Sequence, residues 1–110
     1  GILMSTGAKS GQARRAIVTW SRHGDGYVIA ASKSGAPEDP AWYANLVTHP
    51  DATLEAEGRV QQVRARVAKG AERQQLWDAH VAANPVFAGY PSLTTREIPV
   101  IVLEPVAQPA

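Results

Sequence analysis

Short runs of β-branched and other apolar residues, separated by glycine- and proline-containing turns, dominate the pattern along the chain. Such runs are typical of β-strands rather than helices. We predict strands at residues 1–6, 16–21, 27–32, 52–57, 62–67 and 98–103. Gly24-Asp25-Gly26 and Gly58 supply the turns of two hairpins, because glycine tolerates the positive φ that tight turns need.

The second of these hairpins, residues 52–67, alternates apolar and polar positions on both strands. One face is therefore expected to be apolar, and the other to be a ladder of glutamates against arginines paired across the strands. Exposed pairs of this kind contribute only about 0–1 kcal/mol each. The last strand, 98–103, is continuously apolar and is expected to be buried on both faces, with Pro99 at its start or at a sheet edge.

Two helices are expected among the strands. Asp39 can cap a short helix at 41–48, with Pro40 as its first residue. A longer helix at 71–84 has an apolar stripe at helical spacing, formed by Leu76, Trp77, His80 and Val81. Residues 86–97 are predicted to be a loop.

These elements favour a mainly β or α+β fold, a small antiparallel barrel of about six strands with two attached helices. The strands follow one another through tight turns, without the βαβ alternation of a doubly wound nucleotide-binding sheet. The 110 residues fit a single domain, with residues 106–110 as a tail. The sequence begins within a predicted strand, so we expect that a preceding N-terminal segment of the native protein is missing.

Composition narrows the possible functions. The chain has 11 Lys and Arg against 10 Asp and Glu, which removes the general argument for a nucleic-acid binder. It has no cysteine, which excludes a disulfide scaffold, a thiol nucleophile and a cysteine-ligated metal, and is compatible with the cytoplasm. The three histidines, His23, His49 and His80, lack the spacing of a metal pair, and no apolar run reaches the ~20 residues that span a bilayer.

Two cationic loops are the strongest candidates for a binding site. Residues 7–11 carry Lys9 and precede Arg14 and Arg15, and residues 32–37 carry Lys33 before a helix. The first loop lacks the spacing of a phosphate-binding P-loop and is followed by a strand, so an ATPase is rejected. If strands 16–21 and 27–32 pair, Arg15 and Lys33 lie at the same end of that hairpin. Solvated loop cations or a site for a phosphorylated or polycarboxylate ligand both fit this pattern.

The short helix adds aromatic residues to this picture. Trp42 either packs the helix onto the barrel or, with Tyr43, forms a wall against a planar ring. Asn45, on the next turn, is either a surface residue or a hydrogen-bond partner of a loop. His23 is expected in an exposed hairpin turn, His49 in a loop, and His80 as a partly buried packing residue.

Several blocks of the sequence resemble one known family. The stretches STGAKSGQARR, GYVIAASKSGAPEDPAWYANLVTHPDATLE, ERQQLWDAHVAANPVFAGY and REIPVIVLEPV are similar, in the same order from Met4 to Val106, to the deazaflavin-dependent nitroreductase family. Its members are actinobacterial reductases that use coenzyme F420. The resemblance implies a split β-barrel similar to the flavin-binding split barrels.

The resemblance also implies where a deazaflavin binds. The basic loop of the family matches Lys9 and Arg14, its phosphate-binding loop matches residues 32–35, and its aromatic helix matches Trp42 and Tyr43. The expected cofactor-binding residues are Lys9, Ser10, Gly11, Arg14, Arg15, Ile17, Ala30, Ala31, Ser32, Lys33, Ser34, Gly35, Trp42 and Tyr43. Ser32 and Tyr90 are the expected catalytic residues, and no metal is implied.

The activity implied by the resemblance is hydride transfer from reduced coenzyme F420 to an activated double bond, a quinone or a nitro compound. Positions that carry tyrosines in nitroimidazole-reducing relatives match Thr19, Asn84, Phe87 and Tyr90, so a single phenol remains. A non-catalytic carrier of F420 or another flavin, and an oxidoreductase of the same superfamily using FMN or a pyridoxal-type group, are the alternatives. The resemblance is compatible with a homodimer, and with contact to the inner membrane through the missing segment.

Overall fold

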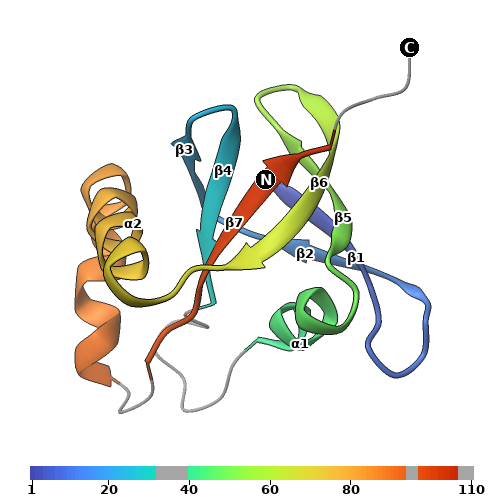
Figure 1. The fold of residues 1–110 in the computed structure, drawn as a ribbon, viewed down its shortest axis with the longest axis horizontal. Helices are drawn as coiled ribbons and strands as arrows, with labels where there is room; N and C mark the ends of the chain where they lie inside the picture. Colours follow the sequence, from blue (N-terminus) through green and yellow to red (C-terminus); the bar gives the residue numbers. More distant parts are fainter. Residues whose placement is uncertain (32–39, 94–96, 107–110) are drawn as a thin grey trace.

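The strands form one curved antiparallel sheet in the computed structural model, which describes residues 1–31, 40–93 and 97–106 (Figure 1). The seven described strands are hydrogen-bonded in the order β2-β1-β5-β6-β7-β4-β3. They are β1 (Ile2–Thr6), β2 (Ala13–Ile17), β3 (Trp20–His23), β4 (Gly26–Ala30), β5 (Asp51–Ala56), β6 (Arg59–Val67) and β7 (Val100–Pro105). The helices are α1 (Ala41–Thr48), α2 (Gly70–Ala83) and the 3-10 helix η2 (Pro85–Leu93).

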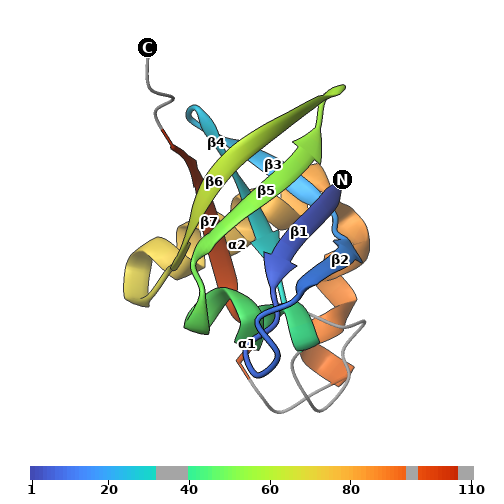
Figure 2. The same cartoon turned by 90° about the vertical axis from the view of Figure 1, so that its right-hand side faces the viewer.

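The two edge strands of the sheet, β2 and β3, are separated in sequence only by Val18 and Thr19. The sheet must therefore curl until its edges approach each other, as Figure 2 shows. Val18 and Gly1 exchange two backbone hydrogen bonds of 2.9 Å at this corner. The result is an incompletely closed antiparallel barrel, which confirms the expected split β-barrel with one strand more than predicted.

The predicted strand at 16–21 is wrong, because the chain changes partners in the middle of this β-branched run. Residues Ala13–Ile17 pair with β1, whereas Trp20–His23 pair with β4. The expected hairpin between 16–21 and 27–32 is therefore replaced by a shorter one, β3–β4, around Gly24 and Asp25. Arg15 lies on β2, which pairs with β1, so the hairpin expected to bring Arg15 and Lys33 to one end does not form. Lys33 lies outside the described residues.

Burial on both faces of β4 and β7 explains their continuous apolar sequences. Inside the barrel, one cluster contains Tyr27, Ile29, Ile101 and Leu103 together with Leu3, Leu54, Val63 and Leu46 of α1. On the outer face, a second cluster contains Val28, Ala30, Val100 and Val102 beneath Leu76 and Trp77 of α2 and Phe87 of η2. Alternate residues of each strand thus enter different cores, which confirms the prediction for the last strand; Pro99 lies just before it.

The helices occupy different sides of the barrel. Figure 2 shows α1 below one end of the barrel, while α2 lies against the outer face of β3, β4 and β7. Residues Pro85–Leu93 form η2, so the predicted loop at 86–97 is wrong over most of its length. The short α1 begins after Pro40, which occupies the N-cap position and makes no side-chain capping bond; Asp39 lies outside the described residues.

The expected pairing of glutamates with arginines across β5 and β6 is also wrong. The register places Glu55 opposite Val60. Arg66 instead bonds to Glu104 on β7, at 3.1 Å, and to Glu72 on α2. These hydrogen bonds raise the pKa of Arg66 and lower that of Glu72. The arginine therefore ties the sheet to α2 rather than to the neighbouring hairpin strand.

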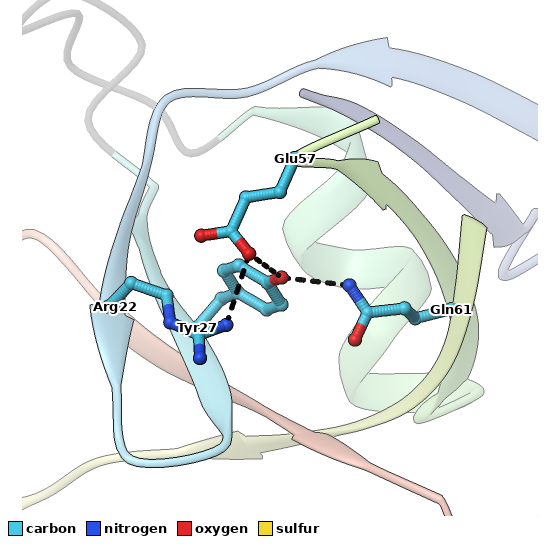
Figure 3. Close-up of polar contacts among 4 residues, drawn as sticks. All are labelled: Arg22, Tyr27, Glu57 and Gln61. Carbon is cyan, nitrogen blue, oxygen red and sulfur yellow. Dashed lines mark hydrogen bonds and ion pairs between the residues drawn. The ribbon is translucent and has the colours of Figure 1, made fainter. Parts of the chain in front are cut away.

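A polar cluster joins the two hairpins at the barrel end away from α1 (Figure 3). The hydroxyl of the buried Tyr27 donates to Glu57 at 3.2 Å and accepts from Gln61 at 2.8 Å. Arg22 lies 3.4 Å from the same carboxylate and 5.1 Å from the tyrosine ring centroid. Glu57 has a φ of 55°, which is unfavourable for a residue with a Cβ. The cluster therefore holds the strained turn between β5 and β6 against the β3–β4 hairpin.

Candidate functional site

The loop between β1 and β2, residues 7–12, is held in one conformation by its own hydrogen bonds. Gly7 donates to the carbonyl of Gln12 at 2.7 Å, and Gly11, with a φ of 69°, donates to Gly7 at 2.9 Å. The hydroxyl oxygen of Ser10 accepts from the Gln12 amide at 3.2 Å and from Arg14 at 3.3 Å. Ser10 therefore fixes the guanidinium of Arg14 over the loop.

One hydrogen bond connects this basic loop to the aromatic helix α1. The amide of Ala8 donates to Oδ1 of Asn45 at 2.9 Å, which settles the role that the sequence left open for Asn45. Trp42 lies one helical turn before Asn45 on the same part of the helix surface. Trp42 and Tyr43 are half-buried against the inner core, so part of each ring remains exposed. The basic loop and the helix that carries the two aromatic rings therefore meet at one end of the barrel.

The cations of this region have no acidic partner in the part of the chain that the structure describes. Lys9, Arg14 and Arg15 are all exposed, and none forms an ion pair with a carboxylate within the described ranges. Exposed lysine and arginine side chains without a carboxylate partner are donors that bind phosphate and carboxylate groups. The chemistry of these donors therefore fits an anionic ligand.

The register separates neighbouring candidates. Arg14 pairs with Ser5, which is buried and faces the barrel interior, whereas Arg15 pairs with Met4. Because successive strand residues point to opposite faces, Arg15 and Ile17 lie on the outer face of β2, away from Arg14. Ile17 is 89% exposed there. The 7–12 loop thus lies against α1, which carries Trp42 and Tyr43, whereas Arg15 and Ile17 lie on the outer face of β2.

The end of β4 carries the other part of the expected cofactor site. Ala30 and Ala31 are buried, and the Ala31 amide donates to the carbonyl of Pro99 at 2.9 Å. Ser32, Lys33, Ser34 and Gly35 follow directly in the chain and lie outside the described residues, as does the side chain of Tyr90.

The positions matched to the family's substrate pocket have different surroundings. Thr19 is exposed at the corner between β2 and β3. Asn84 caps α2 through its amide, which donates to the His80 carbonyl at 2.8 Å. Phe87 is buried, and its ring packs edge-on against Trp77 and His80, with centroid distances of 6.4 and 4.6 Å. Asn84 and Phe87 therefore support the junction of α2 and η2.

A buried pair that the sequence did not indicate lies beside this junction. Nδ1 of His80 is 2.9 Å from the hydroxyl of Ser21 on β3. His80 is completely buried, and burial lowers the pKa of its imidazole. Two residues 59 positions apart leave no local sequence signal for such a pair. His80 is thus a core residue, more deeply buried than expected, while His23 is exposed as predicted.

Within the described ranges, no group of histidine and acidic residues could hold a metal ion. In the same part of the chain, no helix is long and apolar enough to cross a bilayer.

Comparison with known proteins points to one family. Residues 1–105 match the family model described as F420H2-dependent quinone reductase. An F420H2-dependent quinone reductase of Mycobacterium tuberculosis is 37% identical over 105 residues, covering 93% of this chain and 70% of that protein. A second, putative F420H2-dependent quinone reductase of the same organism is 37% identical over 97 residues, covering 88% of this chain and 82% of that protein.

Solved structures agree with the fold. A structure described as the F420-H2 dependent reductase FDR-A superposes with a TM-score of 0.85 at 35% identity, over 94% of this chain and 91% of that one. A chain described as a domain-swapped dimer gives a TM-score of 0.86 at 35% identity, over 94% of this chain and 78% of that one.

Proposed function

The chain belongs to the F420H2-dependent quinone reductase family, and we propose that it reduces a quinone with reduced coenzyme F420. It is an oxidoreductase that depends on this coenzyme. The observation that carries the quinone assignment is the family match, which extends over residues 1–105. Other activated double bonds and nitro compounds are the second substrate class, and the retention of one phenol among the matched pocket positions disfavours nitro compounds.

The described residues fit the coenzyme through their donor chemistry. The anionic tail would be held by Lys9 and Arg14, which have no acidic partner within the described residues. The exposed parts of Trp42 and Tyr43 would border the ring system. Charge-assisted hydrogen bonds contribute about 1.5–3 kcal/mol each, so several are needed to hold a flexible tail. The site would be completed by the residues that follow Ala31 in the chain, namely Ser32, Lys33, Ser34 and Gly35. Roles of Arg15 and Ile17 in coenzyme binding stay predictions.

The protein's part in the reaction is binding and orientation. When bound, the reduced deazaflavin supplies a hydride equivalent to the acceptor. The proposed role of Ser32 is a hydrogen bond that orients the ring or the substrate. The proposed role of Tyr90 is a phenol that donates a hydrogen bond to the acceptor oxygen of a quinone. The buried core beneath η2 would keep that helix in place.

The test is a fluorescence titration of oxidised coenzyme F420 with the protein, followed by turnover of a water-soluble quinone by the reduced coenzyme. We expect saturable binding and quinone-dependent loss of the reduced coenzyme. Binding without turnover of any quinone or enone would favour the carrier alternative. Displacement of F420 by FMN at similar concentrations would favour the flavin alternative, and the absence of a saturable change would contradict the proposal.

We also propose that the chain forms a homodimer. The 35% identical structure described as a domain-swapped dimer supports this assembly. On the outer face of the sheet, four residues lie side by side across neighbouring strands: Ile17 of β2, Ile2 of β1, Glu55 of β5 and Val60 of β6. The side chains of Ile17 and Val60 are 89% and 68% exposed. A second copy would cover this row. Light scattering should give twice the chain mass, and Ile17→Glu should reduce it; a monomeric wild-type chain would contradict the proposal. A cytoplasmic location and contact with the inner membrane stay predictions.

A further inference from the structure

The β1–β2 hairpin, residues 1–18, is joined to the rest of the chain through a single corner. Val18 still belongs to the hairpin, because it exchanges two backbone hydrogen bonds with Gly1. Thr19 is exposed, and Trp20 begins β3, which pairs with β4. The hairpin itself contacts the barrel through the ladder between β1 and β5 and through α1. One residue, Thr19, therefore separates two units that pair with different strands.

The corner retains the pattern of an uninterrupted strand. Ala16, Val18 and Trp20 all pack in or against the inner core. Ile17 and Thr19, which alternate with them, are exposed, as the two-residue period of a β-strand requires. The corner contains neither glycine nor proline, and its β-branched residues favour an extended backbone. The bend is therefore imposed by the closure of the barrel and not by the local sequence.

Straightening of this corner releases the hairpin without a permanent loss of its contacts. If residues 13–23 form one continuous strand, the hairpin points away from its own barrel. A second copy, opened in the same way, offers an identical β5 and α1, so the contacts of the hairpin are remade between the two copies. A short connection that is bent against its preference favours such an exchange, because only the closed single chain has to make the bend.

The edges of the sheet give a second reason for the exchange. β2 and β3 are its two edge strands, so each has a row of backbone donors and acceptors outside the sheet ladder. In an exchanged pair, the straightened strands of the two copies cross in opposite directions near Val18, where their backbones can pair. Ile17, the most exposed large apolar side chain in the described part of the chain, lies beside this crossing. A second copy therefore covers both features.

We propose that two copies of the chain exchange residues 1–18 in the homodimer, with Thr19 as the hinge. The inference rests on the proposed homodimer for the assembly, and on the proposed function for the ligand. The basic loop at residues 7–12 belongs to the exchanged segment, whereas α1 does not. The hydrogen bond from Ala8 to Asn45 then joins two copies, so each coenzyme site combines the basic loop of one copy with α1 of the other.

Disulfide trapping tests the exchange directly, since the chain has no cysteine of its own. Met4 of β1 lies opposite Thr53 of β5 in the ladder. Residues in this relation have Cα atoms about 4.5–5.5 Å apart, a separation that a disulfide spans. In the oxidised Met4→Cys/Thr53→Cys protein, the crosslink should join two chains, and a denaturing gel without reductant should show a covalent dimer.

The matched control is Thr53→Cys/Gln62→Cys, because both positions lie in the β5–β6 hairpin. Its crosslink should stay within one chain, which also measures random crosslinking between dimers. Ile2→Cys/Glu55→Cys uses another pair of the β1–β5 ladder and repeats the test if the first variant does not fold.

A longer corner tests the role of the hinge. Insertion of Gly-Ser-Gly after Thr19 relaxes the bend of the closed chain. In the Met4→Cys/Thr53→Cys background, the crosslink should then shift from between two chains to within one chain. A crosslink that still joins two chains would contradict the role of Thr19 as the hinge.

Mixed dimers test the shared site. Arg14→Ala changes the exchanged segment and Asn45→Ala changes α1, so each variant alone is expected to bind oxidised coenzyme F420 more weakly. When the two variants are unfolded and refolded together, exchange places both changes in one site of a mixed dimer and neither in the other. A population of sites should therefore regain the wild-type dissociation constant. Without exchange, every site keeps one change and none regains it.

The possible failures are distinguishable. A dimer whose crosslink between positions 4 and 53 stays within one chain would overturn the exchange and leave the homodimer standing. A monomeric wild-type chain would contradict both. A chain that binds no F420 would contradict the proposed function, whereas the crosslink would still decide whether residues 1–18 are exchanged.

Discussion

The hydroxyl oxygen of Ser21 lies 2.9 Å from Nδ1 of His80, and this hydrogen bond joins β3 to α2 within the core. Nε2 of the same ring is buried without a hydrogen-bond partner among the described residues. An unpaired lone pair is tolerated in a core more readily than an unpaired N–H. The geometry therefore favours the neutral tautomer in which Nδ1–H donates to Ser21.

This burial predicts that the free energy of unfolding falls with acidification. Burial lowers the pKa of His80 below its ordinary value of 6.5, so the unfolded chain binds this proton first as the pH decreases. The stability from the neutral ring is therefore complete above pH ~6.5 and declines below it, by at most about 1.4 kcal/mol per pH unit. Urea unfolding of the wild type between pH 7.5 and 5.5 measures this slope.

His80→Asn should flatten that slope, and lower the stability at pH 7.5 by about 1–3 kcal/mol because the packing on Phe87 is lost. His23→Asn, at an exposed position of β3, is the control and should retain the wild-type slope. An undiminished slope in His80→Asn would show that other groups cause the acid sensitivity.

Asn45→Ala should loosen the basic loop from α1. The Ala8 amide loses its acceptor, so the free energy of unfolding should fall by about 1 kcal/mol. Binding of F420 should weaken as well, because the loop that carries Lys9 is no longer held against α1. Asn45→Asp keeps the accepting oxygen and serves as the matched variant for stability. Equal losses in both variants would argue against this hydrogen bond as the cause.

Arg14→Ala should weaken coenzyme binding about tenfold, as expected when a charge-assisted contact is removed. The dissociation constant should also depend less on salt, since one electrostatic contact with the anionic tail is gone. Arg64→Ala, an exposed arginine on β6, is the control. If both variants weaken binding alike, a diffuse positive charge rather than the loop is responsible.

Tyr27→Phe should destabilise the barrel end that carries the strained Glu57 turn. Removal of the hydroxyl leaves Gln61 without its acceptor and Glu57 without one donor, so a loss of about 1–2 kcal/mol is expected in urea unfolding. Tyr43→Phe, at a half-buried position of α1, is the control. A loss no greater than that of the control would mean that the Arg22 pair alone holds this turn.

Local sequence patterns predicted the elements whose buried faces can be recognised from the spacing of apolar residues. The alternation at 52–67 identified β5 and β6, and the continuous apolar run at 98–103 identified β7, because each pattern reflects directly which faces are covered. The helices at 41–48 and 71–84 were also predicted within one residue at each end. The run at 16–21 failed because Val18 and Thr19 are as β-prone as the strands on either side, although they form the corner of the barrel.

Resemblance identified Lys9, Arg14, Trp42 and Tyr43 as candidates, and their roles in coenzyme binding stay predictions. The tertiary structure adds the hydrogen bond from Ala8 to Asn45, which holds the basic loop against α1. The placement of Arg15 on the other face follows from the two-residue period of β2, but only once that strand is known to begin at Ala13.

The sequence by itself determined the kinds of elements, the family and hence the coenzyme, because these depend on short patterns and on the order of similar blocks. The tertiary structure alone decided that β2 pairs with β1 rather than with β4, that His80 meets Ser21, and that Ala8 donates to Asn45. Contacts between residues so far apart depend on how the whole sheet curls to bury its two cores. The local propensity of a segment for strand or helix does not determine which other strand or helix it contacts.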